Sequence, residues 1–146
     1  MGLIDDLVGG PVGLDTAVFI YFIEEHPLYL PLAESLFAAL NEERLVGVTS
    51  TVTLLETLVV PIRAGEIGIA AEYKRFLSHS RGLHLLDLDR DLVRLAAEIR
   101  ARGGLKTPDA LQIAAALMAG CSSFVTNDRK IPPIEALRVL QLRDYL

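Results

Sequence analysis

Short apolar runs alternate along the chain with longer stretches whose apolar residues recur at helical spacing. The runs predict strands over 12–15, 45–49, 83–86, 123–126 and 139–142. The longer stretches predict helices over 17–23, 31–41, 51–64, 69–78, 90–102 and 107–119. Apolar strands separated by helices are typical of a parallel sheet that is covered on both faces. The pattern therefore predicts an α/β fold.

Local signals set several boundaries of these elements. Thr107 is expected as the N-cap of the helix over 107–119, with Pro108 as its first helical residue. Gly9-Gly10-Pro11 separates a leader over 1–10, which we expect to fray, from the first strand. A length of 146 residues fits one compact domain, so we expect a single domain over 1–146.

Three acidic residues fall where strands end or helices begin. Asp15 closes the first strand, Asp128 follows the fourth, and Asp109 lies in the first turn of a helix. In a doubly wound sheet these positions share one edge, where ligands bind. Each acid has a structural alternative: an N-cap for Asp15, a helix-dipole position for Asp109 and a polar turn for Asp128. Their common edge is what favours a functional site.

A fourth acid, Glu56, lies inside a predicted helix. Its neighbours one turn away are mostly β-branched and apolar: Val52, Thr53, Val59 and Val60. Glu56 is therefore expected on a buried face, where an unpaired carboxylate is costly and needs a cavity, a partner or a cation. A structural ion pair is the alternative, but no basic residue lies one turn away on this helix.

Carboxylates gathered at one edge would repel one another without cations. Mg²⁺ and Mn²⁺ prefer carboxylate oxygens, so the four acids predict a divalent-metal site. The three histidines have no metal-ligand spacing, and the single cysteine cannot form a disulfide within the chain or a cysteine-rich zinc site.

Net charge changes this interpretation only slightly. The chain carries a charge of −5, which argues against a generic basic nucleic-acid binder. The four candidate acids account for four of these five negative charges, so bound cations would largely remove the repulsion of RNA. No basic segment opens the chain, and no uncharged apolar run reaches the ~20 residues of a membrane span. We therefore expect a cytoplasmic protein.

Four segments, taken in order, resemble the PIN-domain nucleases, and most closely the prokaryotic VapC-type toxins. They are GLDTAVFI at 13–20, TLLE at 53–56, TPDALQIAAA at 107–116 and FVTND at 124–128. The resemblance implies a three-layer α/β/α fold with a central parallel sheet of four to five strands. It also implies an endoribonuclease, a hydrolase that cuts single-stranded RNA with Mg²⁺ or Mn²⁺. Homodimers and inhibition by a cognate antitoxin are further implications.

Carried over residue by residue, Asp15, Glu56, Asp109 and Asp128 match the family's four acidic positions, as metal ligands and catalytic residues. Thr126 matches the hydroxyl position that accompanies the last acid. Hydrolysis of the phosphodiester would use a metal-activated water, and the resemblance implies products with 5′-phosphate and 3′-hydroxyl ends.

Substrate contacts are expected from groups beside the acids. Arg129 adjoins Asp128 and Lys106 precedes the helix of Asp109, so we expect both to contact phosphates. Thr16 follows the first acid, as is frequent in the family, and is a third candidate for substrate binding. Solvated surface charge is the alternative for each basic residue.

Two other functions remain open from the sequence. A phospho-receiver signalling domain would use Asp15 after the first strand, Asp87 after the third and Thr126 after the fourth. That interpretation leaves Glu56 and Asp109 without a role. The second alternative is a PIN-like module that only binds partners.

Overall fold

The computed structural model describes residues 2–7 and 9–146. Five parallel strands form one sheet in the order β3-β2-β1-β4-β5. The strands are β1 (Val12–Leu14), β2 (Gly47–Ser50), β3 (Leu83–Leu86), β4 (Ser123–Thr126) and β5 (Arg138–Gln141). The predicted α/β fold with a central parallel sheet is therefore confirmed. Each strand lies within a residue or two of its predicted place.

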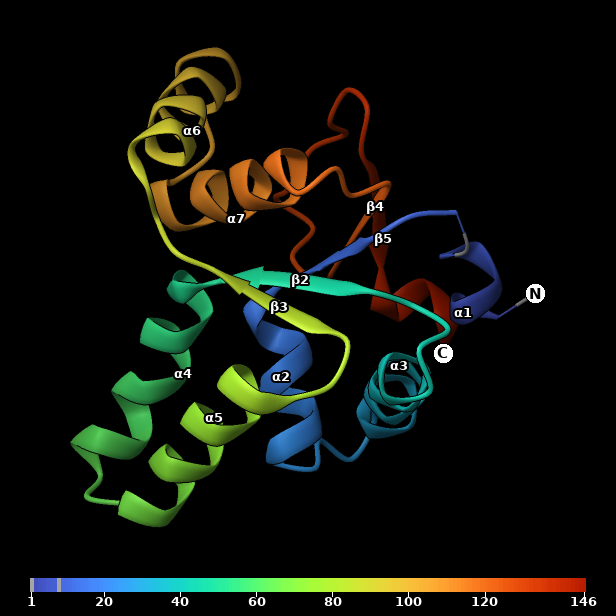
Figure 1. Cartoon of the computed structure of the whole chain (residues 1–146), viewed down its shortest axis with the longest axis vertical. Helices are drawn as coiled ribbons and strands as arrows, with labels where there is room; N and C mark the ends of the chain where they lie inside the picture. The colour runs from blue at the N-terminus through green and yellow to red at the C-terminus, as the bar shows by residue number, and fades with distance from the viewer. Residues whose placement is uncertain (1, 8) are drawn as a thin grey trace.

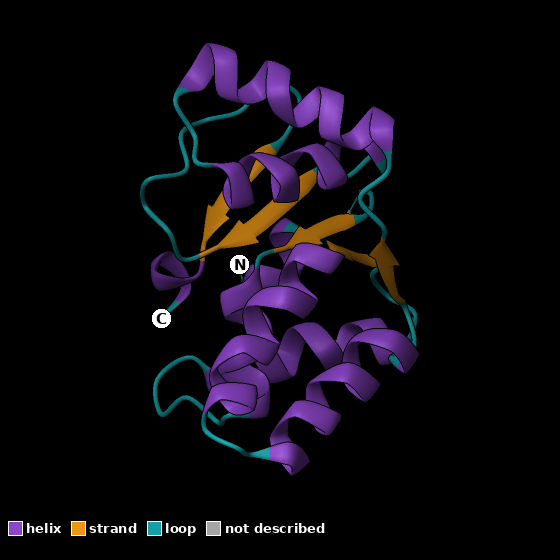
Figure 2. Cartoon of the chain, turned by 90° about the vertical axis from the view of Figure 1, so that its left-hand side faces the viewer, coloured by secondary structure: helices purple, strands orange, loops and turns teal. Residues whose placement is uncertain are grey.

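Helices cover both faces of this sheet, which gives three layers (Figure 1). One face carries α6 (Arg90–Gly103) and α7 (Thr107–Met118). The other carries α2 (Thr16–Ile23), α3 (Leu30–Asn41), α4 (Thr51–Arg63) and α5 (Ile67–His79). Figure 2 shows the strands enclosed between these two groups of helices. No helix in the described part of the chain is both long and apolar enough to cross a membrane.

The ends of the chain pack against this body. The leader contains a short helix, α1 (Leu3–Asp6), and the side chains of Leu3 and Leu7 are buried in the core. These contacts differ from the frayed leader that the sequence predicted; Met1 and Val8 lie outside the described residues. After β5, a 3-10 helix, η1 (Leu142–Tyr145), buries Leu142.

Strand order places the change of direction in the sheet between β1 and β4. The chain runs outward from β1 through β2 to β3, then returns and continues from β4 to β5. Leu14 at the end of β1 lies beside Val125 near the end of β4. Ligands of open α/β sheets bind at such a point, outside the carboxyl ends of the strands.

This strand order also excludes the phospho-receiver alternative. A receiver-type fold has the order 2-1-3-4-5, which makes the first and third strands neighbours. Here β2 separates β1 from β3, so Asp87 follows an edge strand instead of standing beside Asp15. The phospho-receiver interpretation is wrong.

Helix α7 packs unusually close to the sheet because its inner face is made of small residues. Ala110, Ala114, Ala115 and Ala116 are all buried. A Cβ atom on Gly13 would stand 2.9 Å from the Ala116 Cβ and 2.7 Å from the Phe124 ring. Ala116 lies in the last turn of α7; its second turn reaches the carboxyl end of β2, where Ser50 Oγ donates to Gln112 Oε1.

Candidate functional site

Four separate segments bring the acids to the carboxyl edge of the sheet. Asp15 directly follows β1, and Asp128 comes two residues after β4, the strand beside it. Asp109 stands in the first turn of α7, and Glu56 in the second turn of α4. The predicted first turn of α7 needs a correction: Lys106, not Thr107, is the N-cap, and the Thr107 hydroxyl accepts from Arg100 Nη1 (2.9 Å).

Burial and charge repulsion raise the pKa values of two of these acids. Burial raises the pKa of Asp15, and the charges of Glu56 and Asp128 raise it further against the lowering effect of its hydrogen bonds. Burial also raises the pKa of Asp109, helped by the charges of Asp15 and Asp128. Since the charges of neighbouring acids contribute to both shifts, the carboxylates lie close enough to interact electrostatically. Such a group favours the binding of a cation or a proton.

The hydroxyl of Thr126 joins two of the acids. Thr126 is fully buried at the end of β4, and its Oγ1 donates to Asp15 Oδ2 (2.6 Å). The same oxygen accepts the backbone N–H of Asp128 (3.0 Å). The other carboxylate oxygen of Asp15 accepts the backbone N–H of Thr16 (2.9 Å), so Asp15 is also the N-cap of α2. Thr126 thereby fixes both the carboxylate of Asp15 and the turn that carries Asp128.

Glu56 is exposed, so the predicted burial of this residue is wrong. Only the inner side of α4, with Val52 and Thr53, is buried; Val59 and Val60 are exposed by 39% and 63%. The carboxylate has a partner that the sequence did not predict, because Thr16 Oγ1 donates to Glu56 Oε1 (2.6 Å). Helix α4 lies at the periphery of the fold and is half exposed, although its sequence is apolar almost throughout.

A buried polar network lies behind these acids. Gln112, one turn after Asp109 on α7, is only 3% exposed. Its Nε2 lies 2.6 Å from Thr53 Oγ1 and 3.2 Å from Thr16 Oγ1, and its Oε1 accepts from Ser50 Oγ (2.7 Å). The sequence analysis missed this residue. A polar side chain among the alanines and leucines of α7 was the available signal.

The turn after β4 is held from the C-terminal side. The backbone N–H of Lys130 donates to Asp128 Oδ1 (2.9 Å), and Gln141 Nε2 donates to the backbone carbonyl of Asp128 (3.0 Å). Arg143 Nε donates to Asn127 Oδ1 (3.1 Å). These contacts explain how a loop residue such as Asp128 keeps a defined place.

Basic residues line the acidic edge. The charges of Lys106 and Lys130 act on Asp109 and lower its pKa, in opposition to burial and to the neighbouring acids. Both lysines are exposed. Arg129 is exposed as well and stands 4.0 Å from Asp144. Lys106 is therefore placed as the sequence predicted, Lys130 is a further cation near the acids, and Arg129 faces an acid of the C-terminal helix.

The donor chemistry at this edge suits Mg²⁺ or Mn²⁺, since all four groups are carboxylates and two of them have raised pKa values. In residues 2–7 and 9–146, no three Asp, Glu, His or Cys side chains already stand as close as direct ligands do. Hydroxyl groups of Thr126 and Thr16 hold Asp15 and Glu56 in their present positions. The residues fit the cation in chemistry.

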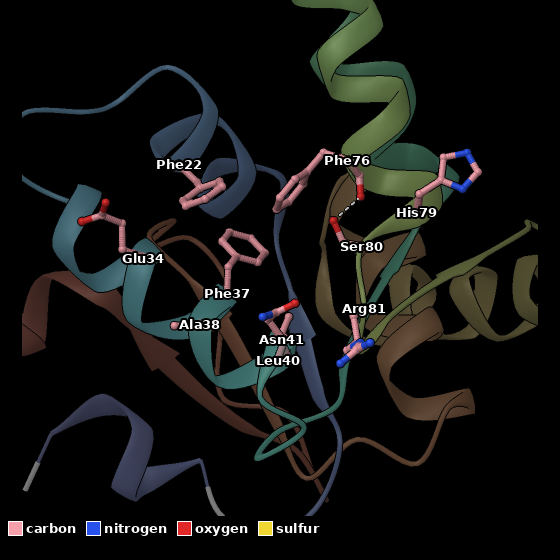
Figure 3. Close-up of a pocket in the computed structure, with 10 residues that line it drawn as sticks. All are labelled: Phe22, Glu34, Phe37, Ala38, Leu40, Asn41, Phe76, His79, Ser80 and Arg81. Atoms are coloured by element: carbon pink, nitrogen blue, oxygen red, sulfur yellow. Dashed lines mark hydrogen bonds between the residues drawn. The ribbon is translucent and has the colours of Figure 1, made fainter.

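A separate cavity of about 590 Å³ lies at the other end of the strands, beside the ends of α3 and α5. Figure 3 shows the rings of Phe22, Phe37 and Phe76 close together among the residues that line it, which also include Glu34 and Arg81. None of the four candidate acids lines this cavity.

Family comparison agrees with the arrangement of the acids. The model of the PIN domain matches residues 12–137. The chain belongs to the PIN domain family. The resemblance stated from the sequence is thus confirmed, and the matched region contains all four acids. Comparison with curated proteins gives no match.

Solved structures with the same PIN-domain fold include toxin–antitoxin proteins. VapBC from Salmonella typhimurium, bound to DNA, superposes with a TM-score of 0.72 at 21% identity, covering 92% of this chain and 99% of that chain. VapBC2 from Rickettsia felis, bound to a promoter fragment, gives 0.68 at 20% identity over 89% and 97%. Mycobacterium tuberculosis VapC20, described as a sarcin–ricin loop cleaving toxin, gives 0.64 at 19% identity over 77% and 86%. At these identities the likeness establishes the fold.

Proposed function

We propose that this PIN domain is a Mg²⁺- or Mn²⁺-dependent endoribonuclease that cuts single-stranded RNA, and the toxin of a toxin–antitoxin pair. The observation that carries the proposal is the meeting of four acids from distant segments at the turning point of the sheet. Two of them have raised pKa values that reflect burial and mutual repulsion. Repulsion of this kind is relieved when a divalent cation binds.

Asp15 and Asp109 are proposed as direct ligands, because they stand on adjoining elements and their charges act on each other. Glu56 would bind directly or through water, and Asp128 would complete a second position or orient water. When bound, the cation would lower the pKa of water and neutralise charge on the scissile phosphate. Thr126 would hold Asp15 with one oxygen facing its hydroxyl, which leaves the other carboxylate lone pairs for ligation.

Lys106 and Lys130 are proposed to attract the phosphates of RNA on either side of the acids, because both act on Asp109. Arg129 is a weaker candidate because it faces Asp144. The hydroxyl of Thr16 donates to Glu56, so we assign Thr16 to holding that acid in place of the substrate contact expected from the sequence. Cleavage would leave 5′-phosphate and 3′-hydroxyl ends.

The partners proposed for this protein follow its structural relatives. The Salmonella typhimurium and Rickettsia felis proteins are complexes of a VapC with a VapB, and both are bound to DNA. By analogy, we propose a cognate antitoxin for this chain; a homodimeric state and a cytoplasmic location are proposed from the sequence expectations alone. An antitoxin encoded in the adjoining reading frame would support this assignment.

A PIN-like module that only binds partners is the second candidate. It is favoured by one observation, namely that no three potential ligands in the described residues stand at ligating distance. Such a module would bind no divalent cation at Asp15 and Asp109.

Cleavage of a mixed single-stranded RNA pool in Mg²⁺ tests the proposal. Asp15→Asn with Asp109→Asn should lower the rate by about 10²–10³-fold, the usual loss when a charge-stabilising group is removed. Asp91→Asn is the matched control, because Asp91 also lies in the first turn of a helix but is not among the charges that shift the pKa values of Asp15 and Asp109. Calorimetry with Mn²⁺ should find a site in the wild type and none in the double variant.

Unchanged cleavage by that variant would refute the assignment of Asp15 and Asp109. A wild type that neither binds Mn²⁺ nor cuts RNA would refute the proposed nuclease and favour the module that only binds partners.

A further inference from the structure

The buried hydroxyls behind the acids have forced orientations. The single proton of Thr49 goes to the carbonyl of Leu14 (3.0 Å), which only accepts. In the 2.8 Å contact between Thr49 and Thr53, the proton must therefore come from Thr53. With its own proton committed, Thr53 can only accept the amide of Gln112 (2.6 Å). The amino group of Gln112 is thus turned toward Thr53 and Thr16.

The other end of the Gln112 amide agrees with this orientation. Ser50 Oγ accepts the backbone N–H of Val52 and gives its proton to Gln112 Oε1 (2.7 Å). Turning the amide over would place its oxygen against Thr53 and Thr16, whose protons already have acceptors. Each donor in the network therefore has one acceptor.

Thr16 completes the sequence of bonds. Its oxygen lies 3.2 Å from Nε2 of Gln112, whose amino group carries a second proton, and its own proton goes to Glu56 Oε1 (2.6 Å). The contact of Thr16 with Thr53 (3.2 Å) lacks a proton because both protons are committed. Gln112 occupies the acceptor side of the Thr16 hydroxyl, so that the proton points outward to the carboxylate.

We propose that Gln112 is a positioning residue that acts through Thr16 to hold the carboxylate of Glu56 toward the acidic edge. The inference rests on the proposed function for its consequence, since it assigns Gln112 to the same metal site. Glu56 is exposed and has no ion pair among the described residues. The buried network supplies the order that an exposed glutamate would otherwise lack.

A double-mutant cycle on Mn²⁺ affinity tests the path. Gln112→Met and Thr16→Val remove the polar groups with little change of volume, and each should weaken Mn²⁺ binding about 10-fold. If Gln112 acts through Thr16, adding Gln112→Met to Thr16→Val should weaken binding less than about 2-fold further. Independent structural roles would multiply the two effects, and that result would overturn the proposal.

Thr57→Val is the matched control for a buried threonine on the same helix as Glu56. Thr57 is 3% exposed, and its hydroxyl donates to the carbonyls of Thr53 and Leu54 within α4. This variant should lose stability without loss of Mn²⁺ affinity. A 10-fold loss here would show that any disturbance of α4 weakens the site, which would also overturn the proposal.

A measurement on the metal-free protein separates this inference from the proposed function. In ¹H–¹⁵N spectra of the wild type, both side-chain N–H protons of Gln112 should exchange slowly with solvent. Thr16→Val should shift one of the two resonances strongly upfield and leave the proton donated to Thr53 in place. If neither resonance moves, the inference fails even where Mn²⁺ binds. If the shift occurs but the wild type binds no Mn²⁺, the network stands and the proposed function fails.

Discussion

Charged and hydroxyl side chains lie at the carboxyl edge of the sheet, whereas aromatic rings and a close backbone contact lie at the amino edge. At the carboxyl edge, burial and the charges of neighbouring acids raise the pKa values of both Asp15 and Asp109. At the amino edge, Phe37 contacts Phe19, Phe22 and Phe76 with ring centroids 4.8–5.4 Å apart. The buried, repelling carboxylates at the carboxyl edge lower the stability of the fold, and the packed rings at the amino edge raise it. The comparison indicates that packing at one end of the strands holds together a repulsive arrangement at the other.

The largest expected effect comes from the backbone of the amino edge. Gly82 precedes β3 with φ +77°, and a Cβ atom there would stand 2.5 Å from the carbonyl oxygen of Leu40. Gly82→Ala should lower the free energy of unfolding by about 4 kcal/mol or leave the chain unfolded. Gly104, the C-cap of α6, is the matched control: its φ is +71° but no atom lies within 4 Å of its Cβ position. Gly104→Ala should cost about 1 kcal/mol. Equal losses in urea titrations would show that φ, and not the close approach, sets the requirement.

A smaller effect should follow from opening the aromatic cluster. Phe37 is 8% exposed, and Phe37→Ala should lower the free energy of unfolding by about 3 kcal/mol. Because the cluster is far from the acids, Mn²⁺ affinity of the folded variant should stay within about 2-fold of the wild type. Urea titration and calorimetry measure the two quantities. A large loss of Mn²⁺ affinity would show that the two edges are coupled.

The smallest effect is a gain in stability at the carboxyl edge. The pKa of Asp109 is raised in the folded protein, so its protonated form is favoured by folding. That contribution is present below the unfolded pKa near 4 and is lost as the pH rises through the folded value. In metal-free buffer at pH 7.5, Asp109→Asn should therefore raise the midpoint of thermal unfolding by about 2–4 °C.

Near pH 3 this advantage should disappear, because Asp109 is then protonated in both states. Asp91→Asn measures the loss of a favourable helix-dipole charge together with an exposed contact to Arg94 (4.0 Å), and it should lower the midpoint slightly. With excess Mg²⁺, the wild type should gain stability and Asp109→Asn should not. A fall in the midpoint of metal-free Asp109→Asn at pH 7.5 would contradict the repulsion.

Much of this arrangement could be predicted from the sequence, because apolar runs mark strands and the edge rule then groups Asp15 with Asp128. The burial of Glu56 could not be predicted correctly. Residues such as Val59 and Val60 give α4 an apolar appearance all round, but periodicity does not reveal that a helix lies at the periphery. Solvent reaches one side of it, and Glu56 stands there.

The hydroxyl and amide network was also beyond sequence reasoning. Thr16, Thr53 and Gln112 are far apart along the chain, and only the strand order and the close packing of α7 bring them together. A single polar residue in an alanine-rich helix is compatible with solvent exposure. The hydrogen bonds that give it a role depend on three-dimensional distances.

The pairing of β1 with β4 also bears on how the protein is made. Val12 lies beside Ser123 in the sheet, so β1 can pair with β4 only after residue 123 has been synthesised. Asp128, together with the Gln141 that holds its turn, is synthesised after the other three acids. A growing chain therefore carries an incomplete set of acids. The four acids of the proposed ribonuclease site can therefore meet only after residue 128 has been synthesised.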